Sequence, residues 1–120
     1  MKNRSVLIVD DDKDYLRLVE CVVELAGIKA HYATNGEEAV EILKKGNFAS
    51  MITDLHMPGM DGFELAMLAK ELSPDIDIVM ITSEMSSDVI CLAAQAGISK
   101  VFAKTIRADQ IQKIARGKCR

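Results

Sequence analysis

Hydrophobic and polar positions follow two different periods along this chain. Four short, largely apolar runs predict strands, the first of them covered on both faces, and a mixed run at residues 28–33 predicts a strand at the edge of a sheet. Between these runs, apolar residues recur three or four positions apart, as in amphipathic helices. The predicted strands are residues 5–9, 28–33, 48–53, 76–81 and 100–103, and the predicted helices are residues 15–26, 35–46, 63–70, 87–96 and 109–115.

Turn and capping residues separate these segments. Gly27 and Gly97 stand where two helical patterns stop, and Asp61 can cap the helix that follows it, because its side chain can accept hydrogen bonds from first-turn amides. Five strands alternating with five helices predict an α/β fold. We expect a parallel sheet with right-handed crossovers and helices on both faces.

Composition limits the class of protein. The chain has 120 residues, of which 49% are hydrophobic and 28% charged, so residues 1–120 are predicted to form one globular domain. No apolar run approaches the ~20 residues of a membrane span, and the first strand leaves no room for a signal peptide. We therefore expect a cytoplasmic protein that does not contact a membrane.

Charge and cysteine content exclude further classes. The net charge is −3, and the basic last fifth of the chain fits a solvated helix face better than a nucleic-acid patch. The three cysteines, Cys21, Cys91 and Cys119, are isolated, which indicates neither a disulfide framework nor a zinc site. Two of them fall in helical patterns and are predicted to be small core residues.

Polar side chains stand where the predicted strands end. Asp10 and Asp11 follow the first strand, Asp54 the third, Thr82 the fourth and Lys104 the fifth. In an open α/β sheet, ligands bind in the crevice outside the carboxyl ends of the strands. These five residues are therefore the candidates for chemistry.

The types of these residues indicate phosphoryl chemistry with a hard metal ion. Carboxylates brought together repel unless a cation neutralises them, and oxygen ligands beside a phosphate suit Mg²⁺. A carboxylate can also act as a nucleophile and form an acyl phosphate. That transfer needs positive charge and hydrogen-bond donors around the phosphoryl oxygens, which Lys104 and Thr82 would supply.

The segment D-x-x-M-P-x-M-D-G at residues 54–62 resembles the phosphoacceptor segment of receiver domains of two-component response regulators. With the strand-end residues above and T-N-G-E-E-A at residues 34–39, the resemblance covers nearly the whole chain. It implies a flavodoxin-like (βα)5 sandwich with strand order 2-1-3-4-5, like that of a single-domain chemotaxis regulator.

The resemblance also implies roles for individual residues. Asp54 would accept a phosphoryl group from a phosphohistidine of a sensor histidine kinase or histidine phosphotransfer protein. Thr82 would contact the phosphoryl group, and Lys104 would pair with Asp54 or with the phosphoryl oxygens. The implied ligands of Mg²⁺ are Asp11, Asp54 and the main-chain carbonyl of His56, with Asp10 assisting directly or through water.

Such a protein is a signalling phosphoacceptor and not an enzyme, apart from its own phosphorylation and dephosphorylation. Phosphorylation would change the surface at the fourth helix and fifth strand and thereby select an unknown downstream protein target. The chain would be a stand-alone regulator or part of a longer protein, without direct nucleic-acid binding, and a monomer or a phosphorylation-dependent dimer.

The sequence departs from the family pattern at two places. Thr105 follows Lys104 where the family usually has proline, and Val101 stands where it usually has Tyr or Phe. By strand alternation, Phe102 should point to the opposite face of the sheet. His56 and Glu84 match positions that influence how fast the acyl phosphate hydrolyses.

Three alternatives remain open. A degenerate receiver would bind partners without phosphorylation, which Thr105 and Val101 favour. An aspartyl-phosphate hydrolase of the haloacid dehalogenase type needs a carboxylate two residues after the nucleophile, where this chain has His56. A flavodoxin-like cofactor binder needs a phosphate-cradling loop after the first strand, where this chain has aspartates.

Overall fold

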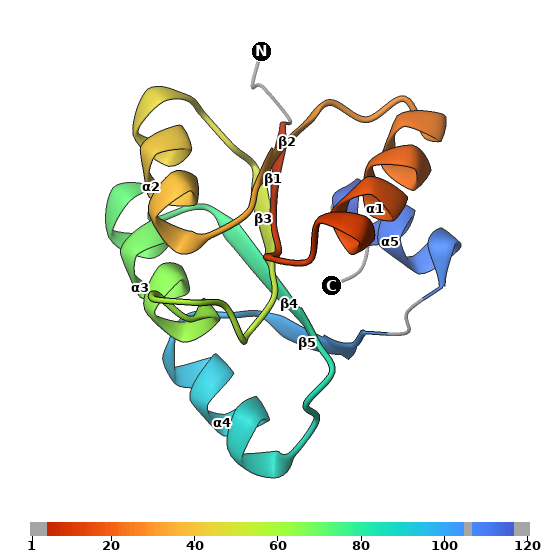
Figure 1. The fold of residues 1–120 in the computed structure, drawn as a ribbon. Helices are drawn as coiled ribbons and strands as arrows, with labels where there is room; N and C mark the ends of the chain where they lie inside the picture. The colour runs from red at the N-terminus through yellow and green to blue at the C-terminus, as the bar shows by residue number, and fades with distance from the viewer. Residues whose placement is uncertain (1–4, 105–106, 117–120) are drawn as a thin grey trace.

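A five-stranded parallel sheet lies between two layers of helices in the computed structural model, which describes residues 5–104 and 107–116 (Figure 1). The strands are β1 (Val6–Val9), β2 (Ala30–Ala33), β3 (Ser50–Thr53), β4 (Asp77–Thr82) and β5 (Lys100–Ala103). Their order is β2-β1-β3-β4-β5, which confirms the predicted fold and the edge position of the mixed strand.

In the part of the chain that the structure describes, four helices connect the strands and a fifth follows β5, as predicted. They are α1 (Lys13–Leu25), α2 (Gly36–Lys45), α3 (Gly62–Leu72), α4 (Ser87–Gln95) and α5 (Ala108–Ala115). α1 begins two residues earlier than predicted, because the Asp12 side chain accepts hydrogen bonds from the amides of Asp14 and Tyr15.

The two faces of the sheet carry separate apolar clusters. Val6 and Ile8 of β1 pack on the side of α1 and α5, while Leu7 and Val9 pack on the side of α2, α3 and α4 (Figure 1). Since both faces are covered, the strand is apolar at every position. This arrangement explains the continuous run that predicted β1.

The prediction that two cysteines lie in the core was wrong. Cys21 and Cys91 are both exposed. The buried stripe of α1 includes Val19 and Val23, and a residue two positions from each points to the opposite side of a helix. Cys21 is that residue, while Cys119 lies outside the described residues.

Glycines follow the ends of α1 and α4, as predicted. Gly27 and Gly97 have positive φ angles of 71° and 92°, as expected for glycines that end helices. No helix within residues 5–104 and 107–116 is long and apolar enough to cross a membrane.

Candidate functional site

Two buried aspartates lie side by side at the point where the strand order reverses. Asp10 directly follows β1 and Asp54 directly follows β3, and the Asp54 amide donates a hydrogen bond to the Val9 carbonyl at 3.0 Å. Asp10 is 3% exposed and Asp54 is 6% exposed. These positions flank the crevice in which a doubly wound sheet binds ligands.

Lys104 connects the two carboxylates. Its ammonium nitrogen lies 2.9 Å from Asp10 Oδ2 and 3.2 Å from Asp54 Oδ2. The side chain reaches them from the end of β5, where the Lys104 amide donates a hydrogen bond to the Thr82 carbonyl at 2.9 Å. Residues far apart in the sequence thus form one charged cluster.

Burial dominates the ionisation of Asp10. It raises the pKa of the Asp10 carboxyl above its ordinary value, and the nearby charge of Asp54 adds to this effect. Hydrogen bonds from Lys104 and from the Asp12 amide act in the opposite direction without cancelling it. One ammonium group therefore does not fully compensate the two buried carboxylates.

The two neighbouring carboxylates dominate the ionisation of Lys104. Burial lowers the pKa of the Lys104 ammonium, but the hydrogen bonds and charges of Asp10 and Asp54 outweigh burial and raise it above its ordinary value. Lys104 is therefore positively charged at neutral pH.

A third carboxylate completes an acidic cluster. Asp11 is exposed, and Asp10, Asp11 and Asp54 can each place an oxygen within 4.8 Å of the other two. Three carboxylates and one ammonium leave an excess of two negative charges. Oxygen donors with this charge fit a divalent cation such as Mg²⁺.

The Asp54 carboxylate is held at both oxygens. Oδ1 accepts a hydrogen bond from the Leu55 amide at 2.8 Å, and Oδ2 accepts one from Lys104. His56 follows in the same loop, but its exposed ring faces Glu84, with Nε2 lying 2.5 Å from Glu84 Oε1. The ring of His56 therefore does not join the acidic cluster.

Thr82 lies at the rim of the cluster and not within its hydrogen-bond network. It is the fully buried last residue of β4, which pairs with β3, and its hydroxyl accepts a hydrogen bond from the Glu84 amide at 3.2 Å. Among the described residues, its side chain forms no hydrogen bond with Asp10, Asp54 or Lys104.

Tyr15 is a member of this site that the sequence did not reveal. The Lys104 ammonium lies 4.9 Å from the centre of its ring, and the Tyr15 hydroxyl donates a hydrogen bond to the Lys104 carbonyl at 3.4 Å. Burial, followed by the charge of Asp10, raises the pKa of the Tyr15 hydroxyl. Tyr15 covers the lysine from α1 and so restricts where its ammonium can point.

One of the two departures from the family pattern, Val101, lies in β5. Val101 packs against the cluster beneath α2, α3 and α4, and Phe102 packs against the cluster beneath α1 and α5. The predicted alternation of these two side chains is confirmed. Thr105, the other departure, lies outside the described residues.

The geometry and the sequence assign the class of the protein. A family model for the response regulator receiver domain matches residues 6–116, so the chain belongs to that family. It is a CheY-like receiver domain of two-component response regulators. These matches support a phosphoacceptor role and do not favour a receiver that works without phosphorylation.

Individual relatives agree with this assignment. The chemotaxis protein CheY-3 of Vibrio cholerae is 35% identical over 92% of this chain and 88% of its own length. The chemotaxis protein CheY of Pseudomonas aeruginosa is 34% identical over 92% of this chain and 94% of its own. The structure is also similar to that of Vibrio cholerae CheY4, with a TM-score of 0.89, 26% identity and coverage of 97% of this chain and 98% of that one.

Proposed function

We propose that Asp54 accepts the phosphoryl group, and that its donor is a phosphohistidine of a sensor histidine kinase or of a histidine phosphotransfer protein. The observation that carries this proposal is a buried carboxylate at the strand switch point with an ammonium group 3.2 Å away. In the transfer, an Asp54 oxygen forms a bond to phosphorus while the bond between phosphorus and the histidine nitrogen breaks. The product is an acyl phosphate.

The neighbours of Asp54 prepare it for this step. The Leu55 amide and Lys104 fix the two carboxylate oxygens, so the carboxylate is oriented before the donor arrives. Because Lys104 also bonds Asp10, its ammonium stays within the cluster and can neutralise phosphoryl oxygens after transfer. Tyr15 keeps the lysine in this position.

Asp10, Asp11, Asp54 and the main-chain carbonyl of His56 would hold Mg²⁺. When bound, the ion supplies positive charge beside the oxygens of the transferring phosphoryl group. The excess of two negative charges in the cluster supports this ligand set.

Phosphorylation would then act as a switch. It adds about −1.5 to −2 charges at the crevice. The Thr82 hydroxyl, which accepts a hydrogen bond from the Glu84 amide, can turn its own hydrogen toward a phosphoryl oxygen. This movement at the end of β4 would bias the surface of α4 and β5 toward a downstream protein target.

Residues 1–120 form one receiver domain, which acts in the cytoplasm as a monomer or as a phosphorylation-dependent dimer. Its chemistry is limited to its own phosphorylation and dephosphorylation.

Intact-mass spectrometry after incubation with acetyl phosphate tests this function. We expect the mass to increase by one phosphoryl group in Mg²⁺ and not in a chelator. The Lys104→Gln variant should gain the group roughly tenfold to a hundredfold more slowly, because one fixed positive charge is lost. Equal labelling with and without Mg²⁺, or equal rates in the two proteins, would contradict the proposed roles.

A further inference from the structure

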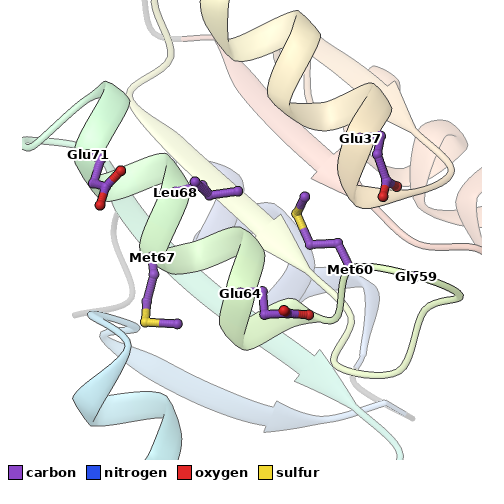
Figure 2. Close-up of a pocket in the computed structure, with 7 residues that line it drawn as sticks. All are labelled: Glu37, Gly59, Met60, Glu64, Met67, Leu68 and Glu71. Carbon is purple, nitrogen blue, oxygen red and sulfur yellow. The ribbon is translucent and has the colours of Figure 1, made fainter.

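A second hollow lies away from the phosphorylation crevice, on the outer surface of α2 and α3. It has a volume of about 560 Å³, and no residue that lines it belongs to the acidic cluster around Asp54. Figure 2 shows its walls, with contributions from α2, from the loop before α3 and from α3 itself. The residues that line this groove are Glu37, Gly59, Met60, Glu64, Met67, Leu68 and Glu71.

The α3 wall of the groove is a regular helical stripe. Met67 and Leu68 follow Glu64 by three and four positions, and Glu71 follows it by seven, so the four side chains share one face of the helix. The two glutamates are seven residues apart, which is about 10.5 Å along a helix axis. Met67, which is 51% exposed, and Leu68 therefore form an apolar centre between two carboxylates.

The opposite wall repeats this combination of apolar and acidic groups. Glu37, in the first turn of α2, faces the loop that carries Gly59 and Met60 (Figure 2). The side chains of Met60 and Leu68 both extend into the space between α2 and α3 in Figure 2. Methionine and leucine offer an adaptable apolar surface of the kind that binds a partner helix.

The groove carries three carboxylates, those of Glu37, Glu64 and Glu71. In the part of the chain that the structure describes, Glu37, Glu64 and Glu71 take part in no ion pair. Two of the three lysines in these helices interact with other groups. Lys44 pairs with Glu41, and Lys70 donates a hydrogen bond to the Ile76 carbonyl.

We propose that this groove binds an amphipathic, positively charged helix of a partner protein. Leu, Met or Phe side chains of that helix would cover Met60, Met67 and Leu68, while Lys or Arg side chains spaced two turns apart would reach Glu64 and Glu71. The three carboxylates repel nucleic acids and anionic lipid surfaces, so charge complementarity favours a cationic protein segment. This interaction is separate from phosphoryl transfer at Asp54.

A synthetic peptide tests the chemistry of the groove. The probe is a helical peptide of Leu and Lys with leucines on one face and lysines seven residues apart. One control peptide replaces each Lys with Glu, and a second has the same composition in scrambled order. In ¹H–¹⁵N spectra, we expect the probe alone to shift the amides of residues 59–71 and of the first turn of α2, and to bind more weakly as salt is added.

Matched variants test which carboxylates carry the binding. Glu37→Gln combined with Glu71→Gln should weaken probe binding about threefold to tenfold, as expected when the exposed ion pair at Glu71 and the nearby negative charge of Glu37 are both lost. Glu20→Gln combined with Glu24→Gln, which removes the same charge from α1, should leave the affinity unchanged. Both double variants should unfold at the urea concentration of the wild type and should still gain a phosphoryl group from acetyl phosphate.

Several outcomes would overturn the proposal. They are equal binding of the Glu peptide, equal binding of the scrambled peptide, equal weakening by the two double variants, and shifts confined to α4 and β5. Sedimentation that shows self-association, lost only in Glu37→Gln with Glu71→Gln, would assign the groove to a second copy of the chain and would also overturn it.

Discussion

The burial of Asp10 lowers the stability of the folded protein, but it places a carboxylate beside Asp54 in the candidate site. Its carboxylate is buried beside that of Asp54, and the two share the ammonium of Lys104. Burial raises the pKa of Asp10 above 3.8, so the folded protein binds this proton more tightly than the unfolded chain does. Between 3.8 and the folded pKa, rising pH therefore lowers the free energy of unfolding.

The Asp10→Asn variant is predicted to be more stable than the wild type at pH 7 in the absence of divalent ions. Asparagine has nearly the same shape but no charge to bury, so it avoids the penalty that the ionised Asp10 carries. The difference in free energy of unfolding should shrink as the pH falls toward 3.8. Urea unfolding in a chelator at a series of pH values measures it. A variant that is less stable than the wild type at pH 7 would contradict this assignment.

At the residue scale, the sequence predicted the acidic cluster and Lys104 because parallel strands bring their carboxyl ends to one edge. Asp10, Asp54 and Lys104 each follow a strand, and the family resemblance supplied the strand order that brings these strand ends together. It missed Tyr15, whose contact with Lys104 spans 89 positions and depends on how α1 packs over the sheet. No local pattern carries that information.

The start of α3 is the element that fixes the loop after Asp54. The Asp61 side chain accepts a hydrogen bond from the Glu64 amide, and the Glu64 side chain accepts one from the Asp61 amide, which forms a capping box. The Gly62 amide donates to the Leu55 carbonyl at 2.9 Å. The helix is thereby anchored to Leu55, the residue next to Asp54.

Gly62→Ala is predicted to destabilise the protein by about 2 kcal/mol or more, as overpacking at a fixed site does. A Cβ at this position would lie 2.4 Å from the Asp54 carbonyl oxygen and 3.0 Å from the Leu55 Cα, and backbone atoms cannot move aside as a side chain can. Urea unfolding measures the loss.

Gly46→Ala is the matched control for this prediction. A Cβ at Gly46 would meet the ring of Phe48 at 3.3 Å, and that ring can shift slightly. We expect a change of less than about 1 kcal/mol for this control, in the range of substitutions away from sites of strain. Equal losses in the two variants would show that the close approach at Gly62 is not the cause.

The elements themselves were predictable to different degrees. The strands and their order followed from apolar runs and from the family resemblance. Helix starts were less certain, since the start of α1 depends on the hydrogen bonds of Asp12 and not on apolar spacing. The exposed Cys21 shows the same limit, because a small apolar residue can occupy the solvent side of a helix.

The whole molecule should be stabilised by Mg²⁺, because an ion that binds only the folded state shifts the unfolding equilibrium. At 100 times the dissociation constant, the expected gain is about 2.7 kcal/mol. Asp11→Asn should reduce this gain, whereas Asp14→Asn, which removes an exposed carboxylate three residues later, should not. Thermal unfolding at increasing Mg²⁺ and constant ionic strength measures it. Equal gains in both variants would remove Asp11 from the ligand set.

The central claim is that this receiver is phosphorylated on Asp54, and locating the phosphoryl group tests it most directly. The protein is treated with acetyl phosphate and Mg²⁺ and then reduced with borohydride, which converts an aspartyl phosphate to homoserine. Peptide mass spectrometry then identifies the converted residue. We predict conversion at Asp54 alone, and none in the Asp54→Asn variant. Conversion at Asp10 or Asp11, or a phosphoryl group that Asp54→Asn retains, would contradict the account.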